Sequence, residues 1–167
     1  MVVRKVLRDD ADHGRSLELQ KVRDPHAVAA LLVAFFAELP EPLCGYEAYE
    51  SWSPHAGDSS AICECVSRLE LDRFILLKYL CSFLKRVVDA VPDVSVTEFA
   101  TVFAPAFMRP RDPEQDQPQT HQKTIEIAHF LIDQHRKLYT LKDGKKMRLE
   151  FKVKTLHCFS PPCLALI

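Results

Sequence analysis

Six cysteines and seven histidines are the side chains best suited to metal binding, redox chemistry or nucleophilic catalysis. The cysteines form no C-x-x-C pair, and the closest two, Cys63 and Cys65, would point in different directions on a helix. The histidines form no H-x-x-x-H pair and have no acidic partner at ligand spacing. We therefore expect reduced thiols, no metal site and no cofactor. The cysteines are Cys44, Cys63, Cys65, Cys81, Cys158 and Cys163.

Catalysis by the chain itself, for instance as a cysteine or metal hydrolase, is the least supported hypothesis. No nucleophile has a base at interpretable spacing, and four scattered glycines cannot form a phosphate-binding loop. The net charge of −1 and one short lysine run, at residues 142–146, argue against a nucleic-acid partner.

The size and composition are those of one globular domain. The chain has 167 residues, of which 47% are hydrophobic and 27% charged. No apolar run reaches the roughly 18 residues that a membrane span needs, and the N-terminus has no secretory pattern. We expect a cytoplasmic protein without a membrane span.

The clearest predicted element is a helix that begins after Asp24. Asp24 can cap it, and Pro25 suits its first position because no backbone donor is needed there. Pro40 and Pro42 then end the helix and force a rigid, extended elbow. Its predicted apolar face consists of Val28, Leu31, Leu32, Phe35, Phe36 and Leu39.

Further helices follow from the same periodicity, which predicts an all-α fold. Ser95 to Glu98 fits a capping box, and the helix it starts is expected to end at Ala104-Pro105. The helix over 71–91 has so wide an apolar surface that we expect burial on most sides, with Arg73 on the solvent side. The other predicted helices cover 2–12, 46–52, 58–69 and 120–139, and Asp58 is expected to cap the third of these.

Residues 140–167 differ from the rest. Met147, Leu149, Phe151 and Val153 alternate with charged residues, which is strand periodicity. A lone strand has no pairing partner in an all-helical fold. We therefore predict a helical domain over 1–139 and an appended non-helical tail over 140–167, loosely ordered or docked on a surface.

Two stretches match a known family in the family's order. HAVAALLVAFFAELPEPL, residues 26–43, resembles the second helix of Rho GTPase-activating (RhoGAP) domains, roughly HAVASLLKxFLRELPEPL. TEFATVFAPAFMRP, residues 97–110, resembles the family's NLAxVFxPxLLRP. The resemblance implies a RhoGAP-like helical bundle, incomplete at the N-terminus, and a Rho-family small GTPase as partner. The matched motif positions assigned a structural role are Leu39, Pro40, Pro42, Leu43, Phe103, Pro105 and Arg109.

Three positions that the resemblance places on the GTPase-facing surface are substituted. Val33 stands where the family usually has lysine, Ala37 where it has arginine, and Glu98 where it has asparagine. This swing of three charges can turn complementarity into repulsion across an interface. The alternative is structural, since the capping box already accounts for Glu98 and a helix face can tolerate small apolar residues at the other two positions.

The catalytic arginine of RhoGAP domains lies in a G-x-x-R-x-S-G loop before the first helix matched here. By spacing from Gly14 and His26, its place falls before Met1, so no catalytic residue is expected in this chain. Arg4 is the nearest candidate, but it lacks flanking glycine and serine and is interpreted as an exposed helix arginine. The chain is then either a fragment or a degenerate RhoGAP-like domain, such as those appended to some inositol polyphosphate 5-phosphatases.

Two functions remain open. The first is small-GTPase signalling, in which the chain binds or regulates a Rho-family GTPase with weak or absent GAP activity. The second is a non-catalytic helical scaffold that has lost GTPase binding and takes a short helical peptide of a partner protein in a groove.

Overall fold

The computed structural model describes residues 2–17, 19 and 22–136, with side chains from residue 6 onward. This part of the chain is helical and contains no strand, which confirms the all-α prediction. The α-helices are α1 (Val2–Asp12), α2 (Pro25–Ala37), α3 (Glu47–Ser51), α4 (Ser59–Ser67), α5 (Leu71–Ala90), α6 (Val96–Phe107) and α7 (Pro118–Asp133). Two 3₁₀ turns, η2 (Ser53–His55) and η3 (Pro113–Gln115), precede α4 and α7. The predicted tail, 140–167, lies outside the described residues.

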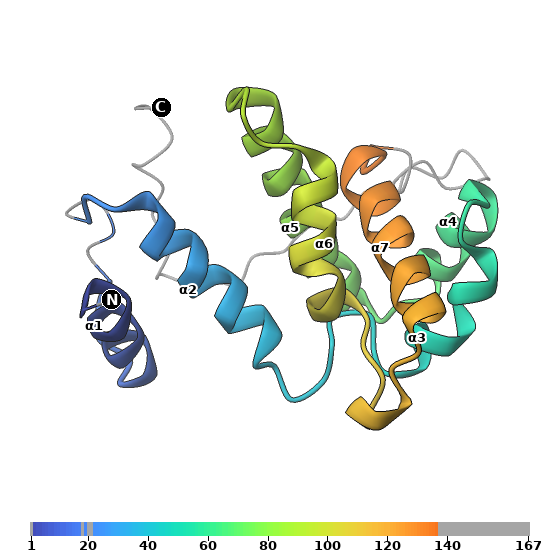
Figure 1. The fold of residues 1–167 in the computed structure, drawn as a ribbon, viewed down its shortest axis with the longest axis horizontal. Coiled ribbons are helices and arrows are strands. Elements are labelled where there is room, and N and C mark those ends of the chain that lie inside the picture. The colour runs from blue at the N-terminus through green and yellow to red at the C-terminus, as the bar shows by residue number, and fades with distance from the viewer. Residues whose placement is uncertain (1, 18, 20–21, 137–167) are drawn as a thin grey trace.

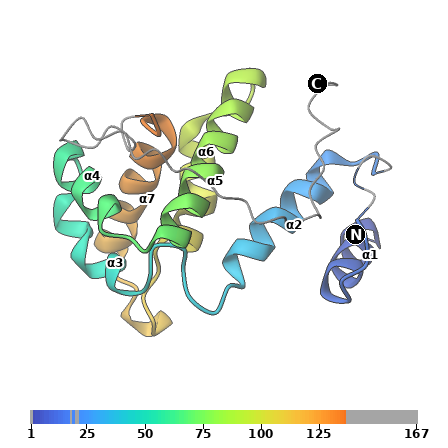
Figure 2. The same ribbon diagram turned by 180° about the vertical axis from the view of Figure 1, so that it is seen from behind.

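Helices α6 and α7 run antiparallel at the centre of the bundle, with α5 beside them and α3 and α4 on the far side of α7 (Figure 1). Helix α2 extends away from the bundle, and α1 packs on its outer side. The view from behind shows the same separation of α1 and α2 from the other helices (Figure 2).

One hydrophobic core joins α3 to α7. Cys81, Ala104, Phe107, Leu131 and Ile132 are wholly buried in it. Phe36 is the residue of α2 that belongs to this core, and Leu7 and Ala27 are buried apart from it. Leu32, Val33 and Leu39 are half-buried and pack against the same core, so α2 contacts the bundle on one side.

The three predicted helix starts with side-chain caps are confirmed. Asp24 Oδ1 accepts from the backbone N–H of His26 at 3.0 Å, and Asp58 Oδ1 accepts from those of Ser60 and Ala61 at 2.9 and 3.1 Å. Ser95 and Glu98 form the predicted capping box at the start of α6. Each bond supplies a partner to a backbone donor that the helix itself leaves unpaired.

Two predicted helix ends were wrong. Helix α6 continues through Pro105 to Phe107, because Ala106 and Phe107 are buried in the core and Met108 N–H still donates to Ala104 O at 2.9 Å. Packing thus outweighs the one hydrogen bond that proline removes. Helix α7 starts at Pro118, which is tolerated as a first residue, and ends at Asp133, before the predicted end.

Two predictions of burial were also wrong. Phe35 of α2 is 59% exposed, although it shares the predicted apolar face with the buried Phe36. On α5, Leu76 and Phe83 were expected to be buried but are 41% and 47% exposed. Both helices contact neighbours on only part of their circumference, so their second apolar face stays in solvent.

Candidate functional site

The elbow after α2 lies against the end of α6. Leu43 N–H donates to Ala106 O, and Cys44 N–H donates to Phe107 O, both at 2.9 Å. Pro42 is fully buried at this junction. Because proline holds the backbone extended and donates nothing, the elbow can lie along the helix end while its neighbours make the hydrogen bonds.

Arg109 connects the two motif stretches. Its Nη2 donates to Leu39 O, 70 positions earlier in the chain, and its Nη1 donates to Pro105 O at 3.3 Å. Phe103 lies beneath this contact in the core, with its ring centroid 6.5 Å from that of Phe36. The structure therefore brings the matched motif positions together around the elbow.

A second arginine holds the elbow from the α5 side. Arg73 Nη2 forms an ion pair with Glu41, and Arg73 Nη1 donates to Pro42 O at 3.2 Å. The hydrogen bond from Arg73 lowers the pKa of Glu41, and the same bond raises the pKa of Arg73. Arg73 was predicted to face solvent, and that prediction was wrong, because its side chain is only 30% exposed.

An aromatic contact completes this junction. Tyr46 Oη donates to Pro40 O at 2.6 Å, and the Arg111 guanidinium carbon lies 5.2 Å from the centroid of the Tyr46 ring. Gly45 precedes Tyr46 with φ of +86°, a conformation that side-chain-bearing residues rarely adopt. The contacts of Glu41, Arg73 and Arg111 were missed from the sequence, since no local pattern links residues so far apart.

The three substituted positions lie on two helices and differ in exposure. Val33 of α2 is half-buried and packs against the core, whereas Ala37, the last residue of α2, is exposed. Glu98 is exposed in the first turn of α6. Phe103, where α2 approaches α6, lies five residues beyond Glu98, or about 7–8 Å along the helix. Val33 and Ala37 therefore lie on one helix of the α2–α6 contact, and Glu98 lies in the first turn of the other.

The Glu98 carboxylate is engaged within its own turn. Its Oε2 accepts from Ser95 N–H at 2.8 Å and from Ser95 Oγ at 2.9 Å, and Glu98 N–H donates to Ser95 Oγ at 3.2 Å. These bonds, the backbone one first, lower the pKa of Glu98. The side chain is thus a fixed negative charge at neutral pH.

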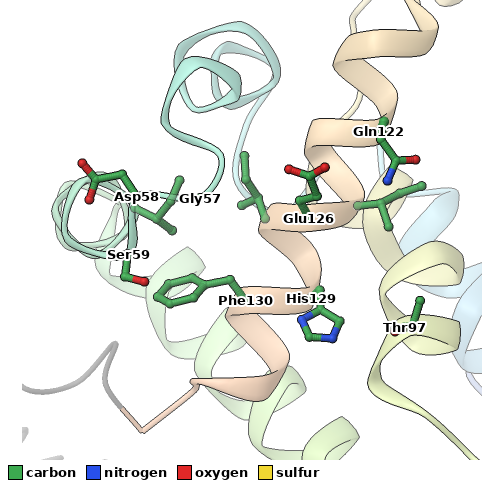
Figure 3. Close-up of a pocket in the computed structure, with 11 residues that line it drawn as sticks. Gly57, Asp58, Ser59, Thr97, Gln122, Glu126, His129 and Phe130 are labelled. Atoms are coloured by element: carbon green, nitrogen blue, oxygen red, sulfur yellow. The ribbon is translucent and has the colours of Figure 1, made fainter.

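A separate pocket of about 350 Å³ lies between α4, α6 and α7. Figure 3 shows that Gln122, Glu126 and His129 come from α7, and Thr97 from α6. None of the predicted site residues lines it. Among the described residues, no group of three His, Cys, Asp or Glu side chains could hold a metal ion.

None of the four described cysteines, Cys44, Cys63, Cys65 and Cys81, forms a disulfide. Burial raises the pKa of Cys44 and of Cys81, so that neither is a thiolate at neutral pH. Within the same part of the chain, no helix is both long and apolar enough to cross a bilayer.

Comparison with known proteins gives one family. The RhoGAP domain matches residues 3–112. The chain is 34% identical over 117 residues to Rho GTPase-activating protein 24 of Homo sapiens, covering 64% of this chain and 16% of that protein. It is 32% identical over 146 residues to Rho GTPase-activating protein 22 of Mus musculus, covering 80% of this chain and 20% of that protein. SH3 domain-binding protein 1 of Homo sapiens is 32% identical over 126 residues, 71% of this chain and 18% of its own length. The chain thus spans a fifth or less of these relatives.

Proposed function

The chain belongs to the RhoGAP domain family, and on that basis we propose that it binds or regulates a Rho-family GTPase with weak or absent GAP activity. The observation that carries the proposal is the family match over 3–112, which includes both faces of the α2–α6 junction. We also propose a cytoplasmic location, because none of the four described cysteines forms a disulfide.

The proposal of weak activity rests on the arginine finger. A finger supplied by a GAP raises the GTPase rate by roughly 10³–10⁵ because it stabilises charge on the transferring phosphoryl group. The sequence contains no G-x-x-R-x-S-G loop. Arg4 is a residue of α1 rather than of a loop. Binding does not need the finger, so association without acceleration is the expected behaviour of this chain.

The proposal of weak binding rests on charge. Ala37 offers no cation to the solvent, and the Glu98 carboxylate is a fixed anion held by Ser95. The family usually has lysine, arginine and asparagine at the positions of Val33, Ala37 and Glu98. The net charge at these three positions is therefore lower by three in this chain. Such a change slows encounter with an acidic partner and weakens the complex.

The test uses the full chain and a panel of GTP-loaded Rho-family proteins. We expect dissociation constants of about tens of micromolar for at least one of them, by calorimetry, and single-turnover hydrolysis within about threefold of its intrinsic rate. Absence of binding to every member at about 100 μM would overturn the proposal. Acceleration of about 10³ or more would overturn the claim of weak activity.

A matched variant tests the interface directly. The triple change Val33→Lys, Ala37→Arg and Glu98→Asn restores the charges usual in the family and is expected to tighten GTPase binding about tenfold or more. Ser95→Thr, which keeps an N-cap hydroxyl, is the control and should leave affinity unchanged.

The second candidate is a helical scaffold that binds a short helical peptide. Leu76, Tyr79 and Phe83 are exposed on one face of α5, at spacings that match a packed helix partner. If the triple variant gains no GTPase affinity and a Tyr79→Ser change abolishes binding of a helical peptide ligand, the scaffold is favoured.

A further inference from the structure

A groove of about 420 Å³ runs between α1, the segment after it and α2. Its floor is apolar and its rim carries Arg8, Asp12 and Glu38. The apolar lining includes Leu17, Leu19, Val28, Leu31, Phe35 and Leu39.

Helix α2 leaves apolar side chains exposed in this groove, which is unusual for a helix of its composition. Residues 25–37 contain no aspartate, glutamate, lysine or arginine, and a helix that is apolar on all sides is normally buried on all sides. One side of α2 meets the bundle through Phe36, and another is covered by α1. Within the groove, Phe35 stays 59% exposed and Leu19 42% exposed. A covering segment would remove this apolar surface from water.

The charges on the rim of the groove favour a segment that carries basic side chains. Arg8 lies 2.7 Å from Glu38 and 3.7 Å from Asp12, so a single cation is shared between two carboxylates. The nearby Arg15 is already engaged by Asp9 and Asp10. Among the described side chains of the rim, negative charge is in excess, and an apolar segment with lysine or arginine beside its apolar residues would neutralise it.

The same chain supplies a segment with this chemistry. Residues 146–153 read KMRLEFKV, so an extended backbone would place four apolar side chains on one face and three basic ones with Glu150 on the other, a net charge of +2. Residues 137–167 contain seven basic and two acidic side chains, whereas residues 1–136 contain 15 basic and 21 acidic ones. The tail and the helical domain thus carry opposite net charge.

The connection is long enough. Residues 137–145 could span roughly 30 Å when extended, at about 3.4 Å per residue. A domain of this size has a radius of gyration of roughly 14 Å. A segment that starts after residue 136 can therefore reach surface up to about two radii of gyration away, and the proposal requires the groove to lie within that span.

We propose that residues 146–153 bind in the α1–α2 groove of their own chain, with the apolar side chains against Phe35 and the basic ones beside Asp12 and Glu38. The bound segment covers the one apolar side of α2 that the helices leave open. The proposal does not depend on GTPase binding.

Limited trypsin digestion of the full chain, followed by mass spectrometry, tests this proposal. Trypsin cleaves after lysine and arginine, and cleavage of a docked segment follows the population of its released form. We expect cleavage after Arg148 to be at least about tenfold slower than in a synthetic peptide of residues 137–160. Raising the salt from about 50 to 500 mM should speed it severalfold, since exposed charge pairs are screened.

Matched variants locate the docking site. Phe35→Asp in the groove and Phe151→Asp in the tail should each raise the cleavage rate after Arg148 by about tenfold. Tyr79→Asp, on the exposed face of α5, is the control and should not change it. Circular dichroism verifies that each variant keeps its helical content.

Three results would overturn the proposal. Cleavage after Arg148 as fast as in the free peptide would show that the tail is not docked. Equal effects of Phe35→Asp and Tyr79→Asp would show that the groove is not the site. Protection that appears at 100 μM but is lost at 1 μM chain would show that the groove holds the tail of a second copy.

Discussion

Helix α2 and the bundle from α3 to α7 differ in how well their apolar side chains are buried, although α2 has no charged residue and α5 and α7 have several. Leu77, Ala104, Leu131 and Ile132 of the bundle are at most 1% exposed. On α2, Phe36 is 4% exposed and its neighbour Phe35 59%. Apolar composition therefore does not decide burial, because burial requires neighbours on every side of a helix.

The substituted positions of the proposed GTPase-facing surface lie on helices from both regions. The α2–α6 junction lies on the boundary between the two regions, with Val33 and Ala37 on α2 and Glu98 on α6. The elbow contacts of Arg73 and Arg109 set how α2 leaves the bundle. Changes at the elbow should therefore alter the position of α2 more than the core of the bundle.

The largest expected effect is on the free energy of unfolding, when one leucine from each region is replaced by alanine. Leu131→Ala in the bundle core should lower the free energy of unfolding by about 2–5 kcal/mol, because it removes apolar contacts and leaves a cavity. Leu31→Ala on α2, where the side chain is half-buried, should cost about 1 kcal/mol or less. Urea denaturation measures both. Equal losses would mean that α2 is as firmly packed as the bundle.

An intermediate effect is expected at the elbow. Arg109→Met keeps a long apolar side chain but removes the donors to Leu39 O and Pro105 O, and should cost about 1–2 kcal/mol. Arg109→Lys, which retains the charge without the planar fork, should recover only part of this loss. In Arg109→Met, the rate of backbone amide hydrogen exchange should rise in α2 and stay unchanged in α7. A uniform rise in both helices would contradict the role of Arg109 as a link between the regions.

The smallest effect concerns the capping box of α6. Ser95→Ala should cost about 1 kcal/mol, because it leaves a backbone donor of the first turn unpaired. The hydrogen bond from Ser95 N–H holds the pKa of Glu98 in the folded chain below its ordinary value of 4.5. Its contribution is therefore present above about pH 4.5 and is lost as the pH falls through the lowered folded value.

The measurement is the urea midpoint between pH 3 and pH 7. Glu98→Gln should flatten the decline of the midpoint below pH 4.5 relative to the unchanged chain. Glu114→Gln, in the exposed η3 turn, is the control and should leave the decline in place. An unchanged slope in Glu98→Gln would show that its carboxylate does not stabilise the fold.

Much of the fold could be predicted because its signals are local. Asp24, Asp58 and Ser95 each bond to a backbone donor within three residues, so the sequence near a helix start is sufficient to place it. The end of α6 could not be placed in this way. Pro105 normally interrupts a helix, but the burial of Phe107 depends on what α6 packs against.

The assignment of Val33, Ala37 and Glu98 to a GTPase-facing surface stays a prediction, because it rests on their positions in two motifs. Their different exposure emerged only from the fold. The pairing of Arg73 with Glu41 was missed, since 32 positions separate them and arginine is equally suited to solvent.

The sequence by itself determined the helical class, the capped helix starts, the proline elbow and the two motifs that assign the family. Tertiary structure alone decided which apolar face of α2 and α5 is covered and which arginines hold the elbow. The physical reason is the range of the interactions. Caps and turns depend on residues a few positions apart, whereas burial and the carbonyl partner of Arg109 depend on segments that only folding brings together.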